Sequence, residues 1–133
     1  MKRYLLDTCA LAWYFVRDKR MENIIEDIDY FKSDFAVSMD SVKELVYLLQ
    51  YGKMQLGMDY KSIIELLIAL NINIINFDMD SLNILSSLPA YKNHTDPTDR
   101  HIIATAIAKK RILISGDEKF GQYVKDGLVF LEI

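Results

Sequence analysis

Hydrophobic residues follow two alternating patterns along the chain, which predict strands and helices in turn. Short apolar runs rich in β-branched and aromatic residues are typical of buried strands, and apolar positions three and four residues apart are typical of helices. The predicted strands cover residues 4–6, 35–38, 72–77, 112–115 and 128–131. The predicted helices cover residues 8–16, 21–31, 42–49, 60–70, 81–88 and 97–110, with a short helical turn at 119–123. This alternation indicates an α/β fold with a mostly parallel sheet covered on both faces.

Composition and charge fit one globular domain over residues 1–133. Hydrophobic residues make up 51% of the chain, which is enough for an ample core. Cys9 is the only cysteine, so neither a disulfide framework nor a thiolate metal cluster is expected, and a cytoplasmic setting fits. The apolar stretch 63–77 is interrupted by one glutamate and three asparagines, so we expect no membrane span. The formal charge of −3 argues against a broad basic face for nucleic acid, unless a bound cation neutralises some of the acids.

Aspartates gather where predicted strands end and a predicted helix begins. Asp7 directly follows the first strand, and Asp117 follows the apolar run 112–114. Asp96 and Asp99 bracket the start of the helix at Pro97. Ligands of parallel α/β proteins bind beyond the carboxyl ends of strands. Carboxylates crowded there repel one another unless a hard divalent cation lies between them, so the pattern predicts a Mg²⁺ or Mn²⁺ site.

Each aspartate also has a structural explanation. Asp7, Asp96 and Asp117 are suitable N-caps, and Asp99 would interact favourably with a helix dipole. Glu44 differs because it lies inside a predicted helix, where capping is impossible and no basic residue lies three or four positions away. Its structural alternative is a solvated surface position. The sequence alone leaves these alternatives open, and the joint arrangement of the five acids favours a site.

Four segments resemble a known family. They are YLLDTCALAWYF from residue 4, VSMDSVKELVYLLQYGKMQL from residue 37, LPAYKNHTDPTDRHIIATAIAKKRILISGD from residue 88, and EKFGQY from residue 118. Together they resemble the PIN-domain ribonucleases, specifically the VapC-type toxins of bacterial toxin–antitoxin pairs. The resemblance implies a three-layer α/β/α fold with a mostly parallel central sheet. The third segment is the most specific of the four.

The resemblance also implies a site and its chemistry. The family's acidic residues fall on Asp7, Glu44, Asp99 and Asp117, with Asp96 as a frequent fifth. Asp7, Asp99 and Asp117 would coordinate one or two Mg²⁺ or Mn²⁺ ions, and Glu44 would complete the cluster or orient the attacking water. The expected reaction is hydrolysis of RNA phosphodiester bonds by a metal-activated water.

Further residues around the acids have expected roles. Ser115 stands where the family usually has a small hydroxyl residue near the metal, and Thr8 lies beside Asp7. Thr98 and Gly116 depart from the family pattern, in which an aromatic and a basic residue are common. Arg100, Lys92 and His94 are expected either to meet RNA phosphates or to be solvated loop residues. Cys9 and Trp13 are expected in the core.

The implied partners are an RNA substrate, a cognate antitoxin protein and a second copy of the chain in a homodimer. Trp13, Tyr14 and Phe15 would provide apolar contacts for a partner, or would belong to the core instead. The sequence does not identify the RNA that is cut.

A receiver-like, Mg²⁺-binding phosphoacceptor domain is the main alternative. It would use Asp78, which follows the apolar segment NIINF, as its phosphoacceptor. Such a domain needs a pair of acids after its first strand, whereas Asp7 is followed by Thr8 and Cys9. It also needs a lysine directly after a late strand, and none follows the strand 112–115. A binding module without catalysis is a third hypothesis, against which the complete set of acids argues.

Overall fold

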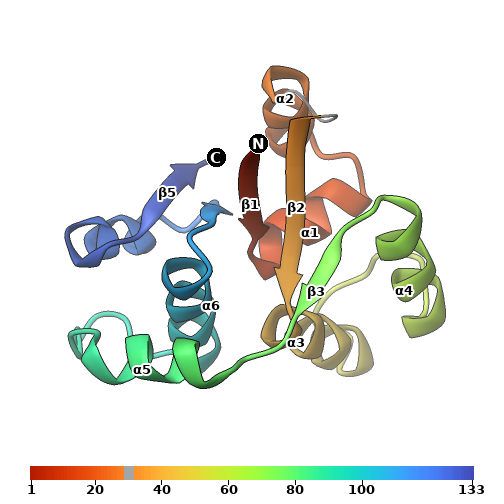
Figure 1. Ribbon diagram of the computed structural model, residues 1–133. Coiled ribbons are helices and arrows are strands. Elements are labelled where there is room, and N and C mark those ends of the chain that lie inside the picture. Colours follow the sequence, from red (N-terminus) through yellow and green to blue (C-terminus); the bar gives the residue numbers. More distant parts are fainter. Residues whose placement is uncertain (29–31) are drawn as a thin grey trace.

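A five-stranded parallel sheet with the strand order β3-β2-β1-β4-β5 forms the centre of the computed structural model, which describes residues 1–28 and 32–133 (Figure 1). The strands are β1 (Lys2–Leu6), β2 (Ser33–Ser38), β3 (Asn73–Ile75), β4 (Ile112–Ser115) and β5 (Val129–Glu132). On the central strand, Leu5 pairs with Ala36 of β2 and with Leu113 of β4. Each of the four strand pairs is parallel, which confirms the predicted fold class.

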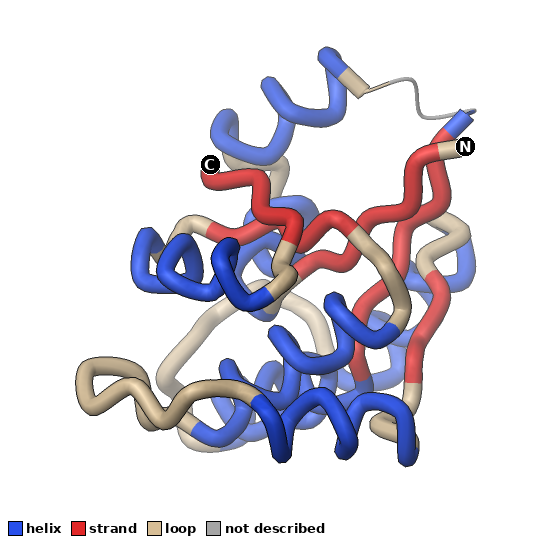
Figure 2. The backbone as a smooth tube through the Cα atoms, turned by 60° about the vertical axis from the view of Figure 1, so that its left-hand side comes forward, coloured by secondary structure: helices blue, strands red, loops and turns tan. Residues whose placement is uncertain are grey.

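Helices cover both faces of this sheet, because side chains along a strand point alternately to its two sides. The helices are α1 (Thr8–Phe15), α2 (Lys19–Asp27), α3 (Met39–Gln50), α4 (Tyr60–Ala69), α5 (Met79–Ser87), α6 (Pro97–Ala108) and the 3₁₀ helix η2 (Glu118–Asp126). Tyr4 and Leu6 of β1 pack in one core with α1, α2, α3 and α4. Leu5 packs in a second core with α5, α6 and η2. The result is three layers, with the strands between two groups of helices (Figure 2).

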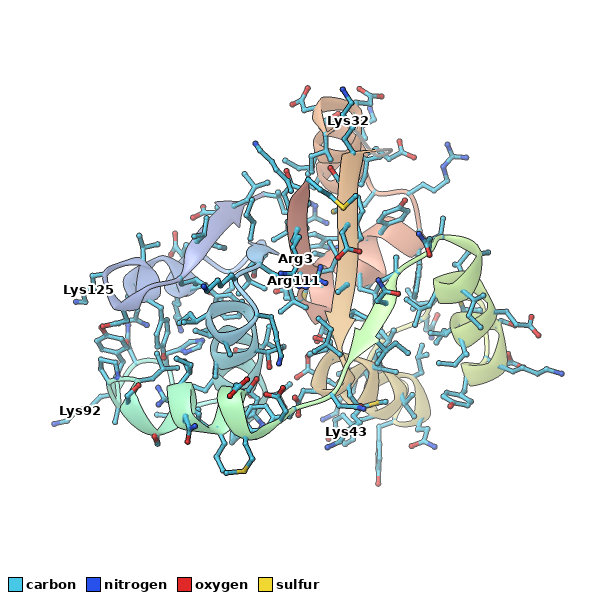
Figure 3. The ribbon with its side chains drawn as sticks, viewed as in Figure 1. Arg3, Lys32, Lys43, Lys92, Arg111 and Lys125 are labelled. Atoms are coloured by element: carbon cyan, nitrogen blue, oxygen red, sulfur yellow. The ribbon has the colours of Figure 1, made fainter. Side chains whose placement is uncertain are left out.

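A buried arginine joins three strands near their amino ends. The Arg111 guanidinium donates hydrogen bonds to the Tyr4 carbonyl of β1 at 3.2 Å and to the Asp34 carboxylate of β2 at 2.7 Å. Arg3 lies 4.0 Å from the same carboxylate, and Figure 3 shows the two arginines close together beside β1 and β2. Because Arg111 immediately precedes β4, this ion pair links the strands on both sides of β1.

Two predicted helix boundaries were wrong. The second helix was expected to reach Phe31, but it ends at Asp27 because Ile28 takes an extended conformation, with φ −91° and ψ 131°. Phe31 itself lies outside the described residues. The helix carrying Glu44 was predicted over residues 42–49, but it begins at Met39.

The cap of that helix is Ser38, whose hydroxyl accepts a hydrogen bond from the Ser41 amide at 3.1 Å.

The strand predicted over 72–77 contains only Asn73–Ile75, since β3 lies at the edge of the sheet and pairs with β2 alone. No helix in the described part of the chain is long and apolar enough to cross a bilayer.

Candidate active site

The predicted acids come from four separate parts of the chain and meet at the carboxyl ends of the central strands. Asp7 directly follows β1, and Asp117 follows β4 after one intervening glycine. Asp99 lies in the first turn of α6, and Glu44 lies within α3, which packs beside α6. Ligands bind at this edge in parallel α/β proteins. The structure therefore brings the predicted residues to the predicted place.

Asp7 is both a helix cap and a buried member of this cluster. Its side chain is only 6% exposed. One carboxylate oxygen accepts a hydrogen bond from the Ala10 amide at 2.7 Å, and the other accepts one from the Ser115 hydroxyl at 2.5 Å. Burial raises the pKa of Asp7 to about 6, although both hydrogen bonds act to lower it, and the charges of Glu44 and Asp117 raise it further.

Among the described residues, Asp99, Asp117 and His94 form a compact group of potential metal ligands. One ligand atom from each side chain lies within 4.8 Å of the other two. Burial raises the pKa of Asp99 to about 7, and the charges of Asp96, Glu44, Asp117 and Asp7 add to the increase. A carboxyl with this pKa holds its proton in part near neutral pH, because ionisation would add another negative charge to a crowded site.

Asp96 and Asp117 also have the capping roles that the sequence left open. Asp96 is the N-cap of α6 and accepts hydrogen bonds from the amides of Thr98 at 2.8 Å and Asp99 at 3.3 Å. Asp117 caps η2 by accepting from the Lys119 amide at 3.0 Å. Capping uses one oxygen of each carboxylate, so it leaves the other oxygen available for a cation.

Ser115 connects two of the acids. Its hydroxyl donates to Asp7 and accepts a hydrogen bond from the Asp117 amide at 3.0 Å. Glu44 is half-buried, and burial raises its pKa, an effect that the neighbouring Thr8 hydroxyl partly offsets. Glu44 is therefore not a fully solvated surface acid, and Ser115 and Thr8 both lie beside acids of the cluster.

The three residues proposed to meet RNA phosphates have different environments. Lys92 is exposed and points away from the helices (Figure 3). Arg100 donates hydrogen bonds to the Pro89 carbonyl at 2.8 Å and to the Tyr123 hydroxyl at 3.1 Å, so its guanidinium already has structural partners. His94 is only 4% exposed, so it is not a solvated loop residue, and its contact with an RNA phosphate stays a prediction. The supporting role of Tyr123 was missed, because the sequence indicated only a short helical turn there.

Packing around α1 explains the glycine at 116. A Cβ atom at Gly116 would lie 2.4 Å from Cη2 of Trp13, so the indole ring occupies the space that any larger residue would need. The guanidinium of Arg20 stacks on the same indole, 3.7 Å from the Trp13 ring centroid. Trp13 is half-buried against the core, whereas Cys9 is exposed and its predicted core position was wrong.

Asp78, the residue on which the receiver-like alternative depends, is engaged elsewhere. It caps α5 by accepting from the Ser81 amide at 3.0 Å, and its second oxygen pairs with Lys109. This ion pair holds the pKa of Asp78 at about 2. The acids that raise one another's pKa are instead those beyond β1 and β4, an arrangement that suits a hard divalent cation.

Fold and site together match the class of α/β proteins that hold a divalent cation at the carboxyl ends of parallel strands. Within that class the chain belongs to the PIN-domain family, whose model matches residues 4–126. A comparison with curated proteins finds no match.

Solved structures share the fold at low sequence identity. The chain is similar to a chain of VapBC2 from Rickettsia felis bound to a DNA fragment from its promoter, with a TM-score of 0.77, 18% identity and 98% of each chain covered. It is also similar to a toxin–antitoxin complex from Klebsiella pneumoniae, with a TM-score of 0.66, 24% identity, and 98% of this chain and 99% of that chain covered. DNA-bound VapBC from Salmonella typhimurium gives a TM-score of 0.69 at 17% identity, covering 99% of this chain and 98% of that chain.

Proposed function

We propose that this chain is a metal-dependent endoribonuclease that hydrolyses RNA phosphodiester bonds, and that it is the toxin of a toxin–antitoxin system that inhibits translation. PIN domains are nucleases, and the acid cluster beyond β1 and β4 is the observation that carries the proposal. Three potential ligand atoms within 4.8 Å, with Asp7 and Asp99 both raised in pKa, support a site that is completed by a cation.

The donor chemistry fits Mg²⁺ or Mn²⁺. Asp7, Asp99 and Asp117 would hold the ion, since carboxylate oxygens suit hard divalent cations. A bound cation would lower the pKa of a water ligand and stabilise the charge that develops on the phosphate. Ser115 and the Ala10 amide fix both oxygens of Asp7, so this carboxylate needs little reorganisation on binding. Glu44 would orient the attacking water, and Asp96 would hold the first turn of α6 in place.

We infer that the natural partners are an antitoxin and a second copy of the chain. The structural neighbours from Rickettsia felis and Klebsiella pneumoniae are toxin–antitoxin complexes, which supports an antitoxin for this chain as well. The three half-buried aromatic residues of α1, which are Trp13, Tyr14 and Phe15, offer apolar surface for such contacts. The dimer is tested by sedimentation equilibrium, where a monomer at every concentration would contradict it.

The experiment that tests the nuclease is a map of new RNA 5′ ends in cells that express the chain. Wild type should produce sharp cuts in one class of RNA, and Asp99→Asn should produce none. Asp80→Asn is the matched control, because Asp80 is an exposed acid in the first turn of α5. It should cut as wild type does.

A reaction with purified protein then tests the metal. RNA from the mapped class should be cut in Mg²⁺ or Mn²⁺, should survive in EDTA, and should be cut again when the metal is restored. Identical 5′-end maps from wild type and Asp99→Asn, with folded wild-type protein free of antitoxin, would reject the nuclease. Full cleavage in EDTA would reject its metal dependence.

A further inference from the structure

A buried imidazole faces the acid cluster with one ring nitrogen that makes no hydrogen bond. Nε2 of His94 lies 3.4 Å from an oxygen of Asp99, yet it has no hydrogen-bond partner among the described residues. The His94 side chain is 3% exposed, so water from bulk does not readily compensate. Leaving a buried polar atom unpaired costs free energy, and such an atom in a native structure requires an explanation.

We propose that Nε2 of His94 is a ligand of the divalent cation, together with carboxylate oxygens of Asp99 and Asp117, and that this nitrogen makes the site prefer Mn²⁺ to Mg²⁺. The inference rests on the proposed metal-dependent function and adds a ligand to its acid set. Ligands of one octahedral ion, with bonds of about 2.1 Å, lie roughly 3–4 Å apart. The three candidate atoms lie within 4.8 Å of one another, so small side-chain rotations bring them to that spacing.

The surroundings of the ring hold it in place for this role. The His94 amide donates a hydrogen bond to the Tyr91 carbonyl at 3.2 Å, which fixes the loop before α6. The imidazole lies edge-to-face against Phe120 and Tyr123, with ring centroids 5.3 Å away in each case. Both aromatic residues are almost completely buried in η2, so they leave the imidazole little freedom to turn.

The other ring nitrogen has the partner that a metal-binding histidine needs. Nδ1 of His94 lies 2.9 Å from the Tyr123 hydroxyl, which also accepts a hydrogen bond from Arg100 at 3.1 Å. With its proton on Nδ1, the imidazole donates to the Tyr123 oxygen and directs the lone pair of Nε2 at the acids. Histidine ligands of metals commonly donate their second N–H in this way. In the opposite tautomer, Nε2–H would be a donor to Asp99, and His94 would only position that carboxylate.

A nitrogen ligand changes which cation the site prefers. Mg²⁺ strongly favours oxygen ligands, whereas Mn²⁺ and later divalent metals also accept imidazole nitrogen. His94→Gln should therefore weaken Mn²⁺ binding by about 10-fold or more, on the scale of losses seen when groups around a metal are removed, and should weaken Mg²⁺ binding less. Tyr123→Phe retains the nitrogen but removes its orienting partner, so it should weaken Mn²⁺ binding while the nitrogen remains coordinated.

Electron spin echo spectroscopy of bound Mn²⁺ tests the ligand directly, because it detects coupling to a coordinated imidazole ¹⁴N. The untagged chain has only two histidines, so His101→Gln is the matched control. His101 lies farther along α6, with Nδ1 3.5 Å from Asp40. Wild type and His101→Gln should show the ¹⁴N coupling, and His94→Gln should lose it. Wild-type protein produced with ¹⁵N-labelled histidine should show coupling to ¹⁵N in place of ¹⁴N. This tests the ligand even if His94→Gln fails to fold.

The outcomes separate this inference from the proposed nuclease. Bound Mn²⁺ that is lost in Asp99→Asn but shows no histidine coupling would overturn the nitrogen ligand and leave the nuclease proposal intact. Coupling lost in His101→Gln instead of His94→Gln would also overturn it. If wild type binds no Mn²⁺, the nitrogen ligand and the preference for Mn²⁺ are overturned, and if it binds no Mg²⁺ either, the metal dependence fails as well.

Discussion

Removing the charge of Asp7 should stabilise the metal-free protein. The pKa of this carboxyl rises from 3.8 to about 6, mainly because it is buried. At about 1.4 kcal/mol per pH unit, ionising it in the folded state costs about 3 kcal/mol above pH 7. Asparagine caps helices as well as aspartate does, so Asp7→Asn keeps the bond to the Ala10 amide. It replaces the charge-assisted bond to Ser115 with a weaker neutral bond, and this lowers the expected gain in stability by about 1 kcal/mol.

The net expectation is therefore a gain of about 2 kcal/mol in the free energy of unfolding at pH 8, or roughly 5–8 °C in Tm for a chain of this size. The gain depends on pH in a defined direction. Below the unfolded pKa near 3.8 the carboxyl is protonated in both states and the cost disappears, so the advantage of Asp7→Asn should be complete above pH 7 and should shrink as the pH falls through 6 toward 4.

Urea unfolding followed by far-UV circular dichroism in EDTA, at pH 8 and pH 4.5, measures this difference. Asp78→Asn is the control, since Asp78 also caps a helix but its pKa is lowered to about 2 by Lys109. Its charge stabilises the folded state above the unfolded pKa, so removing it should destabilise the protein at pH 8. If Asp7→Asn is no more stable than wild type at pH 8 without metal, or keeps its whole advantage at pH 4.5, the reasoning is refuted.

Saturating metal should reverse the order of the two proteins. A ligand at 100 times its Kd stabilises the folded state by about 2.7 kcal/mol. Wild type should gain this amount from Mn²⁺, and Asp7→Asn should gain little. The same urea titrations with and without metal measure both effects.

Three further predictions concern packing, a buried ion pair and the thiol. Gly116→Ala should destabilise the protein by about 1–3 kcal/mol, because its new methyl group meets Trp13, whereas Gly121→Ala, whose nearest contact is 3.9 Å away, should cost much less in the same urea titration. Arg111→Ala should cost about 2–4 kcal/mol by removing a buried cation that joins three strands, and an unchanged midpoint in urea would contradict that role. Although Cys9 is exposed, partial desolvation of its thiol, and then the neighbouring carboxylates, raise its pKa to about 11, so at pH 8 the thiol should react with iodoacetamide more slowly than an ordinary thiol. A rate equal to that of free cysteine would contradict this environment.

Local patterns predicted most of the fold. Alternation of short apolar runs and helical periodicity identified the strands and helices, and Asp7 and Asp117 could be placed at strand ends because they follow those runs directly. The choice of a cap was less predictable. Ser38, Asp40 and Ser41 all suit a helix start, and only the backbone conformation shows that Ser38 is the cap.

Contacts between distant segments accounted for what the sequence did not reveal. His94 is buried because Tyr123, 29 residues later, packs against it, and no local pattern indicates that pairing. In the sequence Gly116 is typical of a turn. In the structure it packs against the indole of Trp13, a residue about 100 positions earlier in the chain. Cys9 lies between the buried residues Thr8 and Ala10, yet it points outward.

The position of β1 in the sheet has a consequence for when the protein becomes active during its synthesis. β1 is made first but lies in the middle, and its second neighbour, β4, pairs with it through Tyr4 and Ile112. Asp7 receives its Ser115 hydrogen bond from that same late strand. A nascent chain on the ribosome therefore lacks Asp99, Ser115 and Asp117 until α6, β4 and the residues that follow them have been translated. The order of synthesis thus delays assembly of the site until β4 can pair with β1.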